Sequence, residues 1–198
     1  MNGFAFLVFD DIKCILAPMK KLLSTVLILF SLSLFAGSQT FEEGTTFQVA
    51  FSPKGECQDI IVNAIDKAQK TILVQSYSFT SAPIAKALMK AHKRGVDAKV
   101  ILDKSQVTQK YSSATFLKNQ KIPLWIDYKP AIAHNKVMII DGHIVITGSF
   151  NFTKAAQENN AENVLVIHSK KLAKIYKECW NDRLSKSKPY SEYKKQEG

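Results

Sequence analysis

Residues 133–153, AHNKVMIIDGHIVITGSFNFT, constrain the fold more than any other stretch of this chain. Two apolar, mostly β-branched runs flank the dipeptide Asp141-Gly142. This pattern is typical of a two-residue hairpin turn whose central residues both adopt positive φ. It therefore predicts an antiparallel hairpin in which Ile140 pairs directly with His143.

Four polar side chains stand at the open end of this hairpin. In the predicted register His134 lies opposite Ser149, and Lys136 lies opposite Thr147. Because side chains alternate between the two faces of a strand, the four polar groups would project from one face: His134, Lys136, Ser149 and Asn151. A lone H-x-K pattern is more often a solvent-facing histidine beside an extended lysine.

Together, these four side chains suit phosphoryl chemistry. A neutral imidazole is a nucleophile near pH 7. An ammonium, a hydroxyl and a carboxamide are donors that can stabilise the oxygens of a phosphate during its transfer. The group contains no cysteine or carboxylate cluster that would hold a metal, and none of the four histidines has the H-x3-H spacing of a metal site.

The complete spacing H-x-K-x4-D-x6-G-S-x-N resembles the motif of the phospholipase D superfamily. It consists of His134, Lys136, Asp141, Gly148, Ser149 and Asn151. Three further segments are similar to the small bacterial members that carry a single motif, the Nuc-type endonucleases: residues 76–88, 94–105 and 160–167. The resemblance covers most of the chain after residue 45.

The resemblance implies catalysis without a metal or any other cofactor. His134 would attack phosphorus to form a phosphohistidine, while Lys136, Ser149 and Asn151 would bind the phosphoryl oxygens. Asp141 would be mainly structural in the turn. Glu162 would orient the imidazole, since a carboxylate on one ring nitrogen fixes the tautomer. The predicted catalytic residues are therefore His134, Lys136, Asp141, Ser149, Asn151 and Glu162.

The chain carries one copy of the motif, whereas larger relatives carry two. In-line transfer through a covalent intermediate needs a nucleophile on one side of phosphorus and a general acid on the other. One chain supplies one motif histidine, His134. We therefore expect a symmetric homodimer with one composite active site on its two-fold axis.

The first 38 residues form a predicted secretory signal region, and residues 39–198 form a single catalytic domain. Met19-Lys20-Lys21 resembles a basic n-region, and the apolar run after it ends at small residues, Ala36 to Ser38. Translation would then start at Met19. This predicts a periplasmic or secreted enzyme with no stable membrane span in its mature form. An uncleaved anchor that uses both apolar stretches is the alternative.

The net charge is +10, and removal of residues 1–38 leaves 24 basic and 15 acidic residues, a charge of +9. Such a surface favours polyanions and equally an anionic membrane. Three functions remain open: an endonuclease acting on DNA or RNA, a phospholipase D acting on phosphatidylcholine-type lipids, and a non-catalytic basic nucleic-acid-binding module. A lipase should expose an extended apolar rim, and the sequence after the signal region shows none, so nucleic acid is the favoured substrate.

The remaining segments alternate strand and helix patterns. They predict an α/β fold with a mixed, mostly buried β-sheet flanked by helices. The resemblance implies that this is a phospholipase D-like fold. Besides the hairpin, the expected strands are residues 46–51, 71–77, 96–102, 122–127 and 162–168, and the expected helices are residues 57–69, 82–94, 112–120 and 170–184.

Four side chains have two interpretations from sequence alone. Cys57 and Cys179 would form a disulfide in an oxidising compartment, or remain two free thiols. Tyr77 and Phe79 follow a predicted strand, where they would line the substrate cleft or pack in the core.

Overall fold

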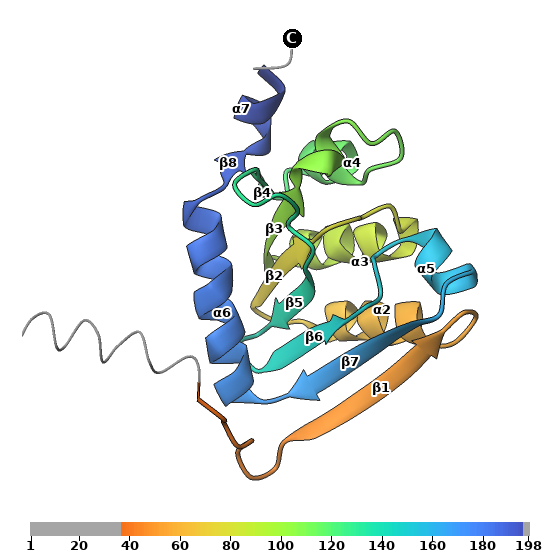
Figure 1. Ribbon diagram of the computed structural model, residues 1–198, viewed down its shortest axis with the longest axis vertical. Coiled ribbons are helices and arrows are strands. Elements are labelled where there is room, and N and C mark those ends of the chain that lie inside the picture. The colour runs from red at the N-terminus through yellow and green to blue at the C-terminus, as the bar shows by residue number, and fades with distance from the viewer. Residues whose placement is uncertain (1–36, 196–198) are drawn as a thin grey trace, which may run out of the picture. The chain divides into compact units, whose positions relative to one another are not determined.

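Eight strands form one mixed sheet in the order β1-β7-β6-β5-β2-β3-β4-β8 (Figure 1). The computed structural model describes residues 37–195. Its strands are β1 (Thr46–Ser52), β2 (Thr71–Ser76), β3 (Asp97–Asp103), β4 (Leu124–Asp127), β5 (Lys136–Ile140), β6 (Ile144–Gly148), β7 (Glu162–His168) and β8 (Lys188–Pro189). Strands β2, β3 and β4 are parallel to one another, and all other neighbours are antiparallel. The predicted α/β fold with a mixed sheet is confirmed.

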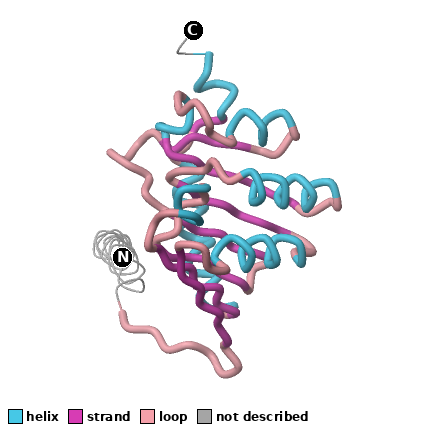
Figure 2. The backbone as a smooth tube through the Cα atoms, turned by 90° about the vertical axis from the view of Figure 1, so that its right-hand side faces the viewer, coloured by secondary structure: helices cyan, strands magenta, loops and turns pink. Residues whose placement is uncertain are grey.

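Helices cover both faces of this sheet (Figures 1 and 2). Helices α2 (Cys57–Lys67), α3 (Ala82–Lys93) and α4 (Ala114–Asn119) pack on one face, and α6 (Lys170–Ser185) packs on the other. Four short elements were not predicted: β8, the 3₁₀ helix η2 (Lys104–Val107), α5 (Lys154–Glu158) and α7 (Tyr190–Lys195). They are too short to show a hydrophobic period in the sequence.

Two local features explain the boundaries and position of α3 and α6. Ser81 caps α3, since its hydroxyl accepts the Ile84 N–H at 3.4 Å. On α6, the indole of Trp180 is buried and its N–H donates to the Val74 carbonyl of β2 at 3.0 Å. This bond satisfies a buried polar group and fixes α6 against the centre of the sheet.

Polar residues lie where the three parallel strands end. The parallel strands β2, β3 and β4 end at Ser76, Asp103 and Asp127, all of which are buried. Strand β5 is antiparallel to β2, and its first residue, Lys136, pairs with Ser76. The segment 128–135 between β4 and β5 therefore lies at the carboxyl ends of the parallel strands, the edge where α/β sheets place ligands.

The hairpin forms, but its register differs by one residue from the prediction. Asp141 and Gly142 adopt φ values of 52° and 66°, and the His143 N–H donates to the Ile140 carbonyl at 3.1 Å. However, Ile140 pairs with Ile144, so the predicted pairing with His143 is wrong. His143 is an extra residue in the connection, and its carbonyl accepts a hydrogen bond from outside the hairpin instead.

A β-bulge at the far end of β6 supplies a second extra residue. Gly148 pairs with Val164 of β7, but the Phe150 N–H donates to the Asn163 carbonyl at 3.2 Å, so the register advances by one between them. Gly148 has a φ of 146°, and a Cβ there would lie 2.2 Å from the Asn163 carbonyl oxygen. Only glycine fits this position.

The structure decides between the two interpretations of the cysteine pair and of Phe79. Cys57 is buried and Cys179 is exposed, and both are free thiols, so the disulfide is not formed. Phe79 is fully buried against Phe152 in the core.

Within residues 37–195 we find no helix with the length and apolar character needed to cross a membrane. The predicted signal sequence lies almost entirely outside the described residues.

Candidate active site

An open pocket of about 370 Å³ lies near these polar strand ends. It is lined by His134, Lys136, Gly148, Ser149, Asn151 and Glu162. These residues come from the start of β5, the end of β6 and the start of β7. Five of the six predicted catalytic residues thus meet in one pocket, and Asp141 lies at the opposite end of β5.

The imidazole of His134 is exposed and contacts two side chains. The Lys136 Nζ lies 3.0 Å from its Nδ1 and 3.1 Å from its Nε2. An atom almost equidistant from both ring nitrogens lies over the ring, not along either in-plane lone pair. The ring of Tyr77 lies 4.6 Å from the imidazole and 5.2 Å from the same ammonium. Both ring nitrogens therefore keep an in-plane lone pair or N–H available for chemistry.

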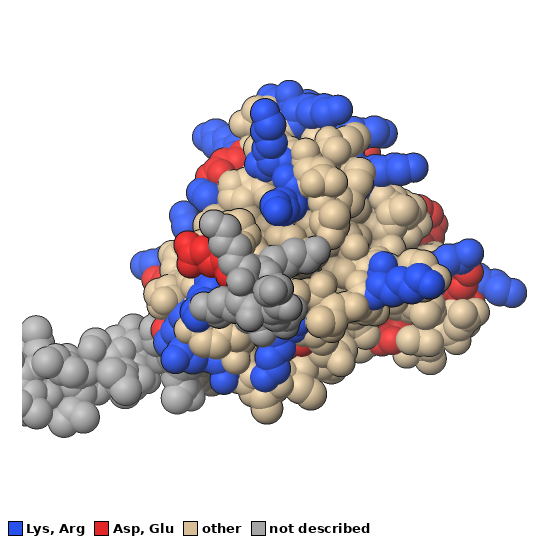
Figure 3. Space-filling view, turned by 90° about the horizontal axis from the view of Figure 1, so that it is seen from above, with Lys and Arg blue, Asp and Glu red and all other residues tan. Residues whose placement is uncertain are grey.

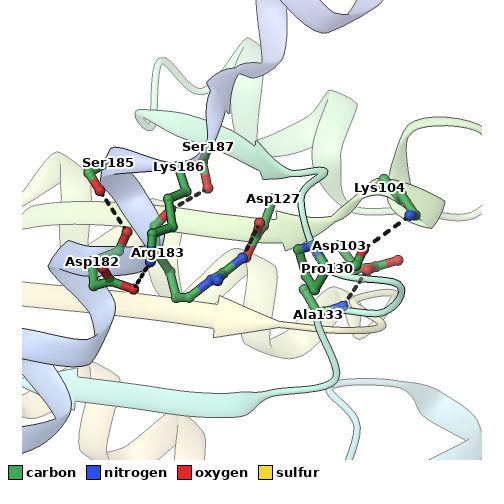
Figure 4. Close-up of polar contacts among 10 residues, drawn as sticks. All are labelled: Asp103, Lys104, Asp127, Pro130, Ala133, Asp182, Arg183, Ser185, Lys186 and Ser187. Atoms are coloured by element: carbon green, nitrogen blue, oxygen red, sulfur yellow. Dashed lines mark hydrogen bonds and ion pairs between the residues drawn. The ribbon is translucent and has the colours of Figure 1, made fainter.

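Two backbone hydrogen bonds hold the residues on either side of His134. The buried carboxylate of Asp103 accepts the Ala133 N–H at 2.7 Å (Figure 4). The Asn135 carbonyl accepts the Tyr77 N–H at 2.8 Å. The Asp103 bond is the stronger of the two, because its acceptor is charged and buried. Together the two bonds hold the chain on each side of the candidate nucleophile.

A second buried carboxylate fixes the start of the same segment. Asp127 is fully buried and makes a bidentate ion pair with Arg183 of α6, with N–O distances of 2.7 and 2.6 Å (Figure 4). The Lys104 ammonium donates to the Pro130 carbonyl at 3.1 Å. The segment from β4 to β5 is therefore tied to both η2 and α6.

Lys136 is only 7% exposed although it lines the pocket. Burial lowers the pKa of Lys136 from its ordinary value, and the negative charge of Glu162 partly opposes this shift. The ammonium also donates to the His134 carbonyl at 2.8 Å. A charged donor shielded from water interacts more strongly with an anion than an exposed one does.

Ser149 and Asn151 supply the remaining donors. The Ser149 hydroxyl oxygen accepts the N–H and the side-chain amide of Asn163, at 3.1 and 3.3 Å, which leaves its own hydrogen free to donate. The Asn151 Oδ1 is buried and has no hydrogen-bond partner among the described residues. Sequence reasoning missed Asn163, whose only signal was its place in the segment 160–167.

Glu162 lines the pocket but does not make the expected bond. Its carboxylate accepts the side-chain amide of Asn160 at 3.1 Å, and no hydrogen bond joins it to His134. The expectation that Glu162 bonds to the imidazole is therefore not met in this structure. Its charge instead acts on the neighbouring Lys136 ammonium.

Asp141 holds the turn to the chain that enters β2. Its carboxylate accepts three backbone N–H groups, from Gln69, Lys70 and Thr71, at 2.7–2.9 Å. Burial by itself would raise the pKa of Asp141, but these three donors lower it below the ordinary value. The structure thus gives Asp141 a structural contact at the far end of the hairpin from the pocket.

Among the described residues there is no cluster of three or more His, Cys, Asp or Glu side chains that could hold a metal. The pocket presents one carboxylate beside an ammonium, an imidazole, a hydroxyl and a carboxamide. This set is suited to binding an anion with a tetrahedral centre.

Comparison with known proteins agrees with this chemistry. The family model described as "Cardiolipin synthase, PLD-like domain" matches residues 61–183. The chain is 47% identical over 133 residues to a phospholipase D of Rickettsia felis, a match that covers 67% of this chain and 66% of that protein. It is 29% identical over 118 residues to human mitochondrial cardiolipin hydrolase, covering 60% of this chain and 47% of that protein.

A solved structure is also similar. The crystal structure of Nuc from Salmonella typhimurium, a phospholipase D family member, superimposes with a TM-score of 0.71 at 43% identity. The match covers 74% of this chain and 98% of Nuc. The fold, the family model and these relatives show that the chain belongs to the phospholipase D superfamily.

Proposed function

We propose that the protein is a metal-independent endonuclease that hydrolyses phosphodiester bonds of DNA or RNA through a phosphohistidine on His134. The observation that supports this most directly is the pocket itself: an exposed imidazole stands beside three donors suited to phosphoryl oxygens, those of Lys136, Ser149 and Asn151. These donors stabilise negative charge that a metal would otherwise stabilise.

The reaction has two steps. An anionic phosphodiester draws the Lys136 ammonium from the imidazole face onto a phosphoryl oxygen. One ring nitrogen of His134 then attacks phosphorus, the N–P bond forms, the bond to the leaving oxygen breaks, and a general acid protonates that oxygen. In the second step the same group, now a base, activates water, which attacks phosphorus and releases the imidazole.

The general acid comes from a second copy of the chain in this proposal. His134 is the single histidine that lines the pocket. In a symmetric homodimer the pockets meet on the two-fold axis, and one His134 is neutral while the other is protonated. Mixing wild-type chains with His134→Ala chains tests this. Activity should fall as the square of the wild-type fraction, and a linear fall would show that each chain completes its own site.

Nucleic acid is the favoured substrate because of charge. The charged side chains visible on the face in Figure 3 are mostly Lys and Arg, which suits a polyanion that extends beyond the pocket. Nuc, whose solved structure is similar, is 43% identical in sequence to this chain. A non-catalytic binding module is less well supported, because a module that only binds does not need an exposed imidazole at the centre of its pocket.

A phospholipase D activity is the second candidate, and one observation favours it. The sequence predicts no apolar rim, but Phe47 and Phe51 are 67% and 65% exposed on β1. Such side chains would insert into a lipid interface. The curated relatives from Rickettsia carry the name phospholipase D, and the match covers about two thirds of their length.

Purified protein should be offered plasmid DNA, single-stranded DNA, RNA and phosphatidylcholine vesicles in parallel, with excess EDTA. We expect cleavage of nucleic acid that persists in EDTA and is lost in the His134→Asn variant. Hydrolysis of phosphatidylcholine alone would establish the second candidate, and loss of activity on chelation, restored by Mg²⁺, would exclude the metal-independent mechanism.

Export is part of the same proposal. A signal of 38 residues followed by a catalytic domain of residues 39–198 would deliver the enzyme to the periplasm or the medium. N-terminal sequencing of the protein recovered from each fraction tests this. A chain that starts near residue 39 supports cleavage, whereas a membrane-bound chain that keeps its first residues supports the uncleaved anchor.

A further inference from the structure

A second cavity, of about 300 Å³, lies between α6 and the sheet and shares no lining residue with the candidate active site. Its lining includes Tyr176, Cys179 and Trp180 of α6, and Gln75, Asn135 and Val137 on the side of the sheet. Apolar and aromatic walls with a few polar groups are typical of sites for small molecules. Two of the lining residues, Gln75 and Cys179, indicate what this cavity binds.

Gln75 is a buried polar residue that points toward α6. It is 4% exposed and lies on β2 opposite Val137 of β5. Its side chain shares a face with Leu73, which packs in the cluster that contains Trp180. Within residues 37–195 its carboxamide has no hydrogen-bond partner. Buried carboxamides are nearly always paired, so the cavity lacks a group that both donates and accepts.

Cys179 places an exposed thiol at the mouth of the same cavity. The other cysteine among the described residues, Cys57, lies on α2 at the opposite face of the sheet. Cys57 is fully buried, and burial raises the pKa of its thiol. Because the thiolate is the reactive form, Cys57 is protected and Cys179 is the thiol that meets molecules from solution.

The cavity lies directly behind the candidate nucleophile. Asn135 lines the cavity, whereas its neighbours His134 and Lys136 line the active-site pocket on the other side of the chain. The Asn135 carbonyl accepts the Tyr77 N–H at 2.8 Å, which is one of the bonds that hold the chain around His134. A molecule that fills the cavity would therefore contact the residue next to the nucleophile.

We propose that Cys179 forms a reversible mixed disulfide with a small peptide thiol, whose peptide part fills the cavity and displaces Asn135. The Cys179 thiolate attacks one sulfur of a low-molecular-weight peptide disulfide, which is the oxidant, and the bond between its two sulfurs breaks. A new S–S bond joins Cys179 to one half of the peptide disulfide. The other half leaves as a thiolate and takes up the proton that Cys179 released.

The chemistry of the cavity favours a peptide over other substituents. A peptide group has one donor and one acceptor, which complement the oxygen and the NH₂ group of the Gln75 carboxamide. Oxidation of Cys179 to a sulfenic acid would add a single oxygen atom, which is far too small to fill about 300 Å³. The effect on hydrolysis rests on the proposed function, because it acts through His134, but the disulfide exchange itself does not.

Exchange kinetics of the full-length protein test the site. Oxidised glutathione, a peptide disulfide, should modify Cys179 at least tenfold faster than bis(2-hydroxyethyl) disulfide does, after each rate is divided by that of the unfolded chain in urea. Mass spectrometry of the Cys179 and Cys57 peptides should show the adduct on Cys179 alone. Gln75→Leu, which keeps a side chain of similar size, should abolish the preference and leave the rate with the hydroxyethyl reagent unchanged.

A thiol elsewhere on the same helix is the matched control. Lys177 is exposed on α6 and does not line the cavity, so Lys177→Cys in a Cys179→Ser background should react with no preference between the two disulfides. Glutathionylation of Cys179 should slow hydrolysis of a model phosphodiester at least tenfold, and dithiothreitol should restore the rate. Modification of the Lys177→Cys control should not change it, and Cys179→Ser alone should keep wild-type activity.

The outcomes separate this inference from the proposed function. Equal normalised rates with both disulfides would overturn peptide recognition in the cavity, and this comparison needs no variant. Disulfide-linked dimers in place of the glutathione adduct would also overturn the inference. Full activity of the modified protein would refute the displacement of Asn135. A reduced protein that hydrolyses no phosphodiester but shows the preference for glutathione would contradict the proposed function and support the exchange site.

Discussion

Replacing Gly148 with alanine should remove activity while the fold survives, because this glycine creates the bulge that aims Ser149 and Asn151. Its φ of 146° belongs to a region that residues with a side chain rarely adopt. An alanine Cβ would stand 2.2 Å from the carbonyl oxygen of Asn163. The substitution therefore acts on the backbone that carries two of the proposed phosphate donors.

The magnitude of the effect follows from this angle and this distance. Backbone strain in such a region costs about 1–3 kcal/mol of stability. Relief of the contact with the Asn163 oxygen requires a displacement of roughly 1 Å, and a misplacement of that size in an active site costs about 100-fold in rate. That rate loss corresponds to about 2.7 kcal/mol of barrier height.

The assay compares Gly148→Ala with Gly142→Ala. Gly142 also has positive φ, 66°, but a Cβ there meets nothing within 4 Å, and it lies at the turn. Its alanine variant should lose about 1–2 kcal/mol of unfolding free energy and keep its kcat/KM within about twofold. A Gly148→Ala enzyme that keeps more than about a third of wild-type kcat/KM would refute the link between the bulge and the donors.

Three further predictions concern charged side chains that the fold holds in fixed contacts. Three N–H donors lower the pKa of Asp141 in the folded state. The Asp141 carboxylate therefore stabilises the fold above the unfolded-state pKa of about 4, and this stabilisation is lost as the pH falls through the folded-state pKa. The difference in urea midpoint between wild type and Asp141→Asn should shrink below about pH 4. Because burial lowers the pKa of Lys136, its ammonium loses its proton below the ordinary 10.5, and kcat/KM should fall on an alkaline limb that Lys136→Arg removes. Arg183→Met leaves the fully buried Asp127 carboxylate unpaired and should cost about 3–5 kcal/mol in denaturant unfolding, much of which the double variant with Asp127→Leu should recover.

Local spacing indicated which residues lie close together, although the predicted register is wrong by one residue. His134, Lys136 and Ser149 line one pocket, as their positions at the open end of the hairpin suggested. Helix α3 was equally predictable, since Ser81 and Pro83 mark its start and an apolar period follows.

Contacts between distant segments gave no comparable signal. Asp103 accepts the N–H of Ala133, which lies 30 residues later in the chain, and this bond leaves no periodic trace in the sequence. The Arg183–Asp127 pair spans 56 residues. Side chains that position a site through the backbone of another segment become visible only when the sheet brings the strand ends together.

The exposed row on β1 illustrates a second limit. Alternation in TFQVAFS correctly indicates a strand. However, one face of that strand holds Ala50 and Ser52, and the other holds Phe47, Val49 and Phe51; hydrophobicity alone assigns the second face to the core. The structure shows the reverse, because β1 is an edge strand and α6 does not extend over it.

The hairpin shows how a wrong register still led to the right face. One extra residue, His143, enters the connection before β6, which by itself would turn Ser149 away from Lys136. A second extra residue enters at the Gly148 bulge, after the ladder with β5 has ended. Because side-chain direction has a period of two, two single-residue insertions on the same strand cancel, and Ser149 returns to the side of Lys136. Gly148 is thus required for the position of Ser149. Without the bulge at Gly148, the Ser149 hydroxyl would lie on the opposite face of the sheet from Lys136.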